Sequence, residues 1–276
     1  MKIAVILTCF NRKEKTQKCL NLLIEETKRR GDIDLHFYIT DDGSSDGTRE
    51  MLCDYSHFIN MTIIDGGNLY WDKGMYKAMQ QAQKDYHDYY LMINDDVVFY
   101  TGFLDVMLDS YKDIGASGGI SGATQDDMHR ITTYGGKHFT SEEFINPNGN
   151  IQECNLANWN CFLVDQNVID KVGIIDPKYA HSFGDYDYSM LMQRKGFRIY
   201  LSKSYIGTCN RNSLIGTFKD KSLTRKQRIK RFFSPKGMSF KSGIRYSFKN
   251  MDYLGLNGLL RFLLAYCRNL IVVLIG

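Results

Sequence analysis

The stretch YYLMINDD, residues 89–96, passes from five apolar and aromatic residues into one amide and two carboxylates. A short apolar run of this kind predicts a buried strand that ends just before Asn94. Carboxylates at the end of a buried strand are costly unless they face water, a ligand or a cation. Because ligands bind at the carboxyl ends of strands in open α/β sheets, Asp95 and Asp96 indicate a site for Mg²⁺ or Mn²⁺ and a diphosphate. Alone, the triplet does not outweigh an ordinary acidic turn.

Apolar runs and helical patterns alternate through the first hundred residues. The patterns predict four strands and three helices, over residues 3–8, 35–40, 59–64 and 89–93 and over residues 13–30, 48–55 and 73–84, respectively. We expect Gly31 to end the first helix. Alternation of this kind predicts an α/β fold with a mostly parallel central sheet and right-handed crossovers.

The pattern changes beyond about residue 115, where glycine-rich, short-strand sequence takes over. Residues 125–150 are expected to form an irregular surface insertion. Two helices and two closing strands are expected after it, over residues 165–172 and 186–195 and over residues 197–201 and 205–209. These elements predict one domain over residues 1–220, followed by an extension over residues 221–276.

The bulk composition is that of a soluble globular protein, with 43% hydrophobic and 24% charged residues in a chain of 276. Seven cysteines occur without any C-x-x-C spacing. Reduced thiols in a cytoplasmic protein therefore fit better than a disulfide framework or a structural zinc site. The apolar start, residues 3–7, is too short for a signal sequence and is expected to be a strand.

Polar loops follow the first two predicted strands. In TCFNR, residues 8–12, Thr8 offers a hydroxyl and Arg12 a cation suited to phosphate, although turn and cap preferences favour a plain helix start. In DDGSSDGT, residues 41–48, Asp41 can accept hydrogen bonds from a base or ribose, or the segment can be a tight turn with a helix cap. The local sequence does not separate these two interpretations.

Two more clusters lie further along the chain. In GGNLYWDKG, residues 66–74, Lys73 could reach phosphate, and Trp71 could either line a sugar site or pack in the core. Asp185 and Asp187 are spaced i, i+2 and so do not share a helix face. One can point into a cleft, where a carboxylate can deprotonate a hydroxyl, while the other braces the helix. Pairing with the helix dipole explains both equally well.

Taken in order, these segments resemble the inverting family 2 glycosyltransferases of the GT-A fold, over about residues 1–215. The resemblance is carried by five motifs in family order and spacing: T-x-x-N-R from Thr8, the turn from Asp41, N-x5-G from Asn68, the triplet from Asn94 and G-D-x-D from Gly184. Leu69-Tyr70-Trp71 and residues 207–212 further look like a subgroup found in bacterial surface-polysaccharide gene sets.

The resemblance implies a role for each matching position. The first half, residues 1–115, would bind the nucleotide of a uridine or thymidine diphosphate sugar through Thr8, Asn11, Arg12, Asp41, Asp42, Asn68, Lys73 and Asp95. Asp96 would hold the Mn²⁺ or Mg²⁺ ion, and Asp185 would be the general base of a single, inverting displacement. The second half, residues 116–220, would complete the acceptor and sugar side, which would comprise Trp71, Asn158, Trp159, Asn160 and Asp187.

The chain departs from this pattern in two places. Many relatives carry a metal-binding His near the end of the last strand, where this chain has Thr208-Cys209-Asn210-Arg211. The triplet also begins with Asn94 rather than a carboxylate. Metal binding would therefore rest on Asp96, water and the diphosphate, or Arg211 would replace part of the metal's charge.

The extension over residues 221–276 is strongly basic, with 12 Lys and Arg and one acid. Its apolar part, residues 256–275, contains Arg261 and Arg268, each of which costs ~2.5–3 kcal/mol near the centre of a bilayer. An amphipathic helix lying on a membrane surface therefore fits better than a span. The alternative is a helix packed on the main domain or on a partner subunit. A nucleic-acid partner is not expected.

The sequence thus predicts a metal-dependent inverting glycosyltransferase at the inner face of the cytoplasmic membrane. It would move a sugar from a nucleotide-sugar donor to a glycan or lipid-linked acceptor in bacterial polysaccharide biosynthesis. One alternative is a nucleotidyltransferase, which usually has a glycine-rich basic loop after the first strand; residues 8–12 lack those glycines. The other is a non-catalytic nucleotide-sugar-binding subunit of a polysaccharide assembly complex.

Overall fold

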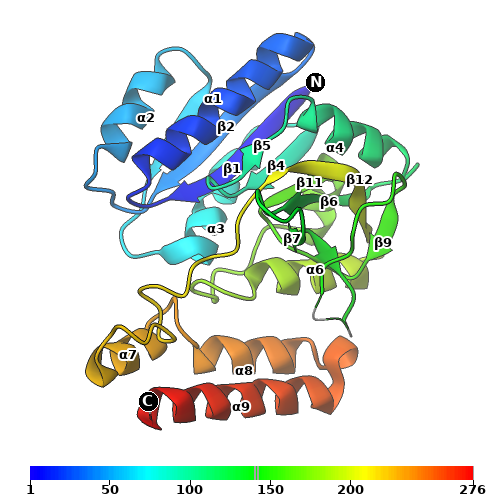
Figure 1. The fold of residues 1–276 in the computed structure, drawn as a ribbon. Coiled ribbons are helices and arrows are strands. Elements are labelled where there is room, and N and C mark those ends of the chain that lie inside the picture. The colour runs from blue at the N-terminus through cyan, green and yellow to red at the C-terminus, as the bar shows by residue number, and fades with distance from the viewer. Residues whose placement is uncertain (140, 142, 276) are drawn as a thin grey trace.

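A ten-stranded sheet forms the centre of the molecule (Figure 1). The structure is a computed structural model that describes residues 1–139, 141 and 143–275. The strand order is β3-β2-β1-β4-β11-β6-β12-β5, with β7 paired to β6 and β9 to β12. The strands are β1 (Lys2–Cys9), β2 (Asp34–Asp41), β3 (Met61–Asp65), β4 (Tyr89–Ile93), β5 (Val98–Phe99), β6 (Gly118–Gln125), β7 (Thr132–Tyr134), β9 (Gln152–Cys154), β11 (Cys161–Asp165) and β12 (Arg198–Thr208).

Strands β1 to β4 are parallel to one another, as the alternation of strand and helix predicts. Side chains of β1 alternate between two cores. Ile3, Val5 and Leu7 pack with the helices on one face, which are α1 (Lys13–Arg30), α2 (Thr48–Ser56) and α4 (Phe103–Lys112). Ala4 and Ile6 pack with the helices on the other face, which are α3 (Tyr70–Ala82), α5 (Gln166–Val172) and α6 (Gly184–Arg194). The predicted α/β fold with a mostly parallel central sheet is therefore confirmed.

The second half of the sheet differs in detail from the prediction. Strand β11 is antiparallel to both of its neighbours, β4 and β6, whereas β12 runs parallel to β6. The two closing strands expected at residues 197–201 and 205–209 are one strand, β12, whose pairing with β6 shifts register on either side of Tyr205. Helix α4 has no counterpart among the predicted elements. The expected irregular insertion at residues 125–150 contains β7 and β8 (Gly136–Lys137), the latter paired with β10 (Leu156–Ala157); residues 140 and 142 lie outside the described part.

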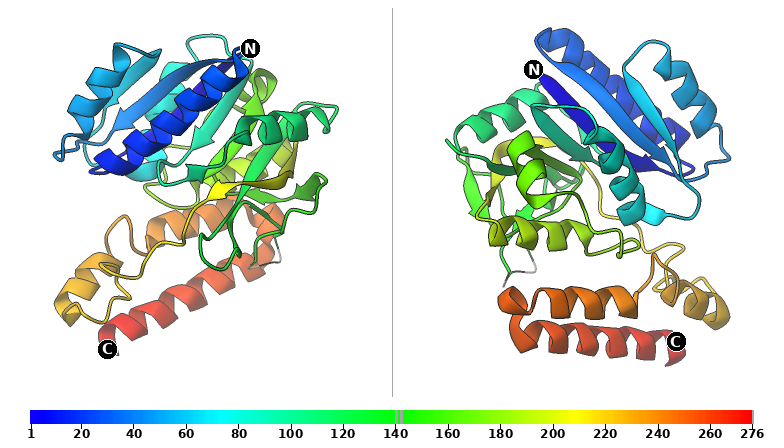
Figure 2. Two further views of the ribbon diagram at one scale, coloured as in Figure 1. Left: turned by 45° about the horizontal axis from the view of Figure 1, so that its top comes forward. Right: turned by 180° about the vertical axis from the view of Figure 1, so that it is seen from behind.

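Three helices follow the sheet and lie together beneath it as a separate layer (Figures 1 and 2). They are α7 (Arg225–Phe232), α8 (Phe240–Lys249) and α9 (Met251–Ile275), the last kinked at Gly255. Partly buried polar contacts attach them to the domain above. Lys249 donates to Asp187 at 2.5 Å and to Asp176 at 3.1 Å, and Arg245 donates to Asp176 at 2.6 Å.

Candidate active site

A cleft of about 940 Å³ opens at the carboxyl ends of β1, β2 and β4. It gathers residues from every sequence cluster described above. The predicted site residues that line it are Thr8, Arg12, Asp42, Asn68, Trp71, Asp95, Asp96, Asn158, Trp159, Asn160 and Asp185. Asn11, Asp41, Lys73 and Asp187 are absent from this lining.

The acidic triplet is held by an ion-paired arginine. The guanidinium Nη1 of Arg12 lies 2.7 Å from Asp95 Oδ1 and 3.1 Å from Asp96 Oδ2. Thr16 donates to the other oxygen of Asp95 at 2.8 Å. Burial raises the pKa of Asp95, and Arg12 opposes that rise. Arg12 is thus committed to the carboxylates. Within the described residues, the hydrogen-bond contact of Asp96 Oδ1 is the weak thiol donor of Cys209, 3.8 Å away.

Two of the predicted carboxylates shape the loops beside the cleft. Asp42 accepts three backbone N–H groups at the start of α3, from Gly67, Leu69 and Tyr70, at 2.8 to 2.9 Å. Asp41 accepts the N–H of Ser44 within its own turn, at 3.0 Å. The Asp41 contact is that of the tight turn considered for DDGSSDGT, whereas Asp42 fixes the loop that leads into α3.

Asn11 joins the loops after β1 and β2. Its side chain accepts the N–H of Ser45 at 2.7 Å, and its own N–H donates to Ser44 Oγ at 2.9 Å. The first turn of α1 is bonded instead by Asp46, which accepts the N–H of Lys13 at 3.0 Å. Asn11 therefore fixes the relative position of two loops and does not cap the helix.

Thr8 reaches the cleft because of a glycine in α3. An added Cβ at Gly74 would lie 2.3 Å from Thr8 Oγ1, so only glycine permits this close packing of α3 on β1. This close packing of α3 on β1 explains why the N-x5-G motif ends in glycine at position 74.

A polar chain crosses the floor of the cleft from α3 to β12. Trp71 Nε1 donates to Asn94 Oδ1 at 2.7 Å, and Asn94 Nδ2 donates to Asn160 Oδ1 at 3.1 Å. Asn160 in turn donates to Cys209 Sγ at 3.2 Å. Trp159 is fully buried edge-on to Trp71, with ring centroids 5.9 Å apart. Trp71 therefore both borders the cleft and packs against the core, so the two roles foreseen for it are compatible.

Asp185 lines the same cleft as the acidic triplet and lies in the first turn of α6. Asn158 Nδ2 donates to its Oδ2 at 3.3 Å, and the N–H of Tyr186 donates to its Oδ1 at 2.9 Å. Burial raises the pKa of Asp185 to about 6. A carboxylate with such a pKa is ionised at neutral pH and can accept a proton more readily than an ordinary aspartate.

Asp187 faces away from the cleft. It is 1% exposed and accepts hydrogen bonds from Lys249, Asn250 and Tyr179, so it anchors the extension. Lys73 is exposed on the first turn of α3 and does not line the cleft. The structure therefore does not place Lys73 on the nucleotide side of the cleft or Asp187 on its acceptor side, as the resemblance implied.

Three residues that the sequence did not single out either line the cleft or lie next to residues that line it. Asp72 is fully buried beside the start of α6, where a Cβ on Gly184 would lie 1.7 Å from its carboxylate; burial and the charge of Asp185 raise its pKa well above the usual value. Arg231 and Lys236 reach the cleft from the extension. No local pattern distinguishes these two from the other basic residues of the tail.

The cleft has one carboxylate placed to hold a divalent metal. Mg²⁺ is commonly held by one or two carboxylates together with water and substrate phosphates. Asp96 supplies one such oxygen at the end of a strand, and its neighbour Asp95 is fully used by Arg12 and Thr16. This donor set fits a cation that is bound chiefly through the ligand's phosphates.

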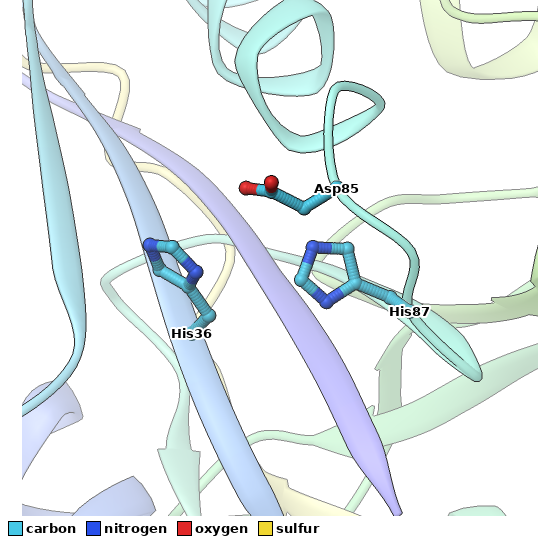
Figure 3. A group of neighbouring side chains, drawn as sticks. All are labelled: His36, Asp85 and His87. Carbon is cyan, nitrogen blue, oxygen red and sulfur yellow. The ribbon is translucent and has the colours of Figure 1, made fainter.

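A second polar cluster lies far from the cleft. Figure 3 shows His36, Asp85 and His87 directed toward one another, with possible ligand atoms within 4.8 Å. The Tyr38 hydroxyl contacts all three, at 2.9 to 3.1 Å. His36 pairs with Ala4, toward the amino ends of the strands. This possible metal site is therefore at the opposite end of the sheet from Asp96.

A family model described as glycosyl transferase family 2 matches residues 4–188. The chain belongs to this family. Its sheet accordingly has a GT-A-like arrangement, and the matched range ends within α6. Among curated proteins, none matches the chain.

Solved structures share the fold of this family 2 chain. TarS of S. aureus (residues 1–349) in complex with UDP is 14% identical with a TM-score of 0.57, covering 85% of this chain and 66% of that one. A mannosyltransferase from Pyrobaculum calidifontis in complex with GDP-Man and Mn²⁺ is 13% identical with a TM-score of 0.56, covering 98% and 72%. A longer structure of S. aureus TarS is 15% identical with a TM-score of 0.58. The match covers 96% of this chain and 49% of that one, so this chain spans about half of the longer TarS. At these identities the likeness shows the fold alone.

Proposed function

We propose that this family 2 chain is a metal-dependent inverting glycosyltransferase that moves a sugar from a nucleotide-sugar donor to a hydroxyl group of a glycan or lipid-linked acceptor in bacterial polysaccharide biosynthesis. One observation carries the proposal. Asp185, whose pKa burial raises to about 6, faces the same cleft as the strand-end carboxylate Asp96. Asp185 is suited to act as a base, and Asp96 is suited to bind a cation.

The donor would lie over the loops that follow β1, β2 and β4. Solved neighbours contain UDP, UDP-GlcNAc or GDP-Man, which supports a nucleotide-sugar as the ligand class. In our proposal Thr8 and Asn68 contact the nucleoside, and Asp41 and Asp42 shape the turns beneath it. Asp96 would hold Mn²⁺ or Mg²⁺, which would supply positive charge to the diphosphate.

The acceptor would enter on the side of Asn158 and Asp185. Asp185 takes the proton of the acceptor hydroxyl as its oxygen attacks the anomeric carbon. A bond forms between that oxygen and the anomeric carbon, the bond from the anomeric carbon to the phosphate oxygen breaks, and the nucleoside diphosphate leaves. Attack from the face opposite the leaving group inverts the anomeric configuration. Asn158 positions Asp185 through its 3.3 Å hydrogen bond.

We also propose that α9 attaches the enzyme to the inner face of an anionic membrane. By length and composition the helix could cross a bilayer, but Arg261 and Arg268 make a span costly. Many apolar side chains of α9 are exposed rather than packed in a core, including Leu256, Leu260, Leu264, Ile271 and Ile275. Exposed apolar side chains beside arginine and a polybasic segment favour an interfacial position.

The catalytic proposal is tested by incubating the full chain with nucleotide-sugars, Mn²⁺ and membrane extract, and by identifying the released product. Nucleoside diphosphate supports a glycosyltransferase, and pyrophosphate would indicate a nucleotidyltransferase. The variant Asp185→Asn is expected to lose transfer at least about 100-fold while it still binds the nucleotide. Asp54→Asn, on the exposed side of α2, is the matched control. Full transfer by Asp185→Asn would refute the base assignment.

A further inference from the structure

The basic extension contributes to the cleft itself. Among the described lysines and arginines, those that line the cleft are Arg12, Arg231 and Lys236. Arg231 lies in the last turn of α7, and Lys236 lies in the loop between α7 and α8. Both are beyond residue 188, where the family match ends. Two of the three cations facing this cleft therefore come from outside the matched domain.

These two cations differ from Arg12 in their partners. Arg12 is bonded to both Asp95 and Asp96, so its charge is already balanced. Within the described part of the chain, neither Arg231 nor Lys236 forms an ion pair with a carboxylate, unlike Arg245 and Lys249 in the next helix. Unbalanced cations at a cleft favour an anionic ligand.

The rest of the cleft offers little other positive charge for a diphosphate. Lys73 and Arg211 do not line it. His181 does, but burial and the charges of Lys236 and Arg12 lower its pKa to about 4, so it is neutral at pH 7. The end of β12 carries Cys209 in place of a metal-binding histidine.

The loop that carries Lys236 is fixed against the end of α7. A Cβ on Gly237 would lie 2.3 Å from the carbonyl oxygens of Arg231 and Phe232, so glycine is required for this turn. The N–H of Met238 donates to Phe232 O at 2.9 Å. The Lys236 ammonium lies 5.9 Å from the centre of the Phe10 ring, in the loop after β1. These contacts hold Lys236 beside the loop after β1, and both cations line the same cleft as the acidic triplet.

We propose that Arg231 and Lys236 bind the diphosphate of the nucleotide-sugar, so that the C-terminal extension completes the donor site. The proposal rests on the proposed glycosyltransferase function. Arginine matches two phosphate oxygens with its planar fork, and lysine acts as a compact charge. As the bond to the sugar breaks, negative charge grows on the leaving diphosphate, and fixed cations stabilise it. The extension would then serve donor binding as well as any membrane.

The test uses the full chain and measures the dissociation constants of UDP, dTDP and GDP, and of the matching monophosphates, with Mn²⁺. The variant with Arg231→Gln and Lys236→Gln is expected to bind the preferred diphosphate at least 10-fold more weakly, with a smaller loss for the monophosphate. The matched control carries Lys226→Gln and Lys230→Gln, two exposed residues of α7 that do not line the cleft. It should bind both ligands like the wild type.

The outcomes separate this inference from the function on which it rests. Equal diphosphate binding by wild type and the Arg231/Lys236 variant would overturn the inference alone. Equal weakening by the control variant would also overturn it, because general charge would then explain the loss. If the wild type binds no nucleoside diphosphate with or without Mn²⁺, the glycosyltransferase proposal fails as well. Arg231→Lys, measured alone, keeps the charge but loses the planar fork, so its affinity for the diphosphate should lie between those of the wild type and Arg231→Gln. A thermal melt checks that each variant is folded.

Discussion

Asp185 and Asp187 stand two residues apart and face different parts of the molecule. At the start of α6, a spacing of i, i+2 turns the two side chains to opposite sides of the helix. Asp185 meets Asn158 at the cleft, whereas Asp187 meets Lys249 and Asn250 of the extension. The sequence allowed one of the pair to point into a cleft while the other braces, or both to pair with the helix dipole, and the resemblance placed Asp187 on the acceptor side. It did not reveal that two of the residues that bind Asp187 come from the extension, more than 60 residues further along the chain.

The raised pKa of Asp185 predicts the pH dependence of transfer. The base must be ionised to accept the acceptor's proton, so kcat/KM should be nearly constant above about pH 7, halve near pH 6 and approach a tenfold fall per pH unit below about pH 5. The profile is measured with the free enzyme at saturating Mn²⁺ and low substrate. A profile that stays flat down to pH 5 would contradict the assignment of Asp185 as the base.

The same pKa predicts a stability cost. Burial raises the pKa of Asp185 from 3.8 to about 6, so between these values the folded state binds more protons than the unfolded state. The ionised group therefore destabilises the fold, and the cost reaches at most about 3 kcal/mol above pH 6. Asp185→Asn should raise the free energy of unfolding at pH 7.5 by about 1–3 kcal/mol, with little change at pH 4, where the native group is mostly protonated. Urea unfolding at both pH values measures this, with Asp54→Asn unchanged as the control.

At the scale of elements, local pattern predicts the first half of the sheet well and the second half poorly. Strands β1 to β4 are mainly apolar runs separated by helices, so their type follows from composition and their limits lie within about two residues of the prediction. Strand β12 is interrupted by Ser202, Lys203 and Ser204, which suggested two strands. In the fold Ser202 is fully buried, because it accepts the N–H of Ala123 and donates to the carbonyl of Ser204. A polar residue satisfied by another strand carries no signal in its own neighbourhood.

The candidate site shows the same limit. The sequence clusters at the strand ends meet at one cleft because parallel strands end on the same edge. The pairing of Arg12 with Asp95 and Asp96 and the arrival of Arg231 depend on contacts between distant segments. Such contacts follow from the tertiary fold, and a single sequence does not reveal them.

The contact between α8 and α6 gives a prediction at this scale. Lys249 neutralises the buried Asp187 and also contacts Asp176. Lys249→Met should lower the free energy of unfolding by about 2 kcal/mol, because it leaves a buried carboxylate with only neutral partners. Lys241→Met, at an exposed position of the same helix, should change it little. Chemical denaturation compares the two, and equal stabilities would mean that Asn250 and Tyr179 suffice to hold Asp187.

At the scale of the whole molecule, the extension borders the cleft on one side and exposes α9 on the other. Its loop after α7 reaches the cleft, and α9 lies on the side of α8 away from the sheet (Figures 1 and 2). Arg228 is buried and joins α7 to α9, donating to the carbonyls of Phe218 and Val272 at 3.0 and 3.2 Å. A membrane bound at α9 would therefore hold Arg231 and Lys236 at a set distance from the lipid surface. Deleting residues 221–276 would remove both features and expose Asp187, so point variants are the cleaner test.

The membrane proposal predicts a specific loss. Leu260 and Leu264 are 46% and 71% exposed and lie one turn apart on α9. Leu260→Glu with Leu264→Glu should weaken co-sedimentation with vesicles that contain phosphatidylglycerol by at least about 10-fold, because each change removes apolar burial and adds a charge repelled by the lipid. Nucleotide binding should stay at the wild-type level, since neither residue lines the cleft.

Phe58→Glu, at an 86% exposed position just after α2, is the control that separates the apolar face of α9 from general surface hydrophobicity. Binding should also weaken with salt through Arg261 and Arg268. If the α9 variant sediments with vesicles as the wild type does, the exposed face of α9 is not the membrane contact, and a partner subunit becomes the better explanation for it.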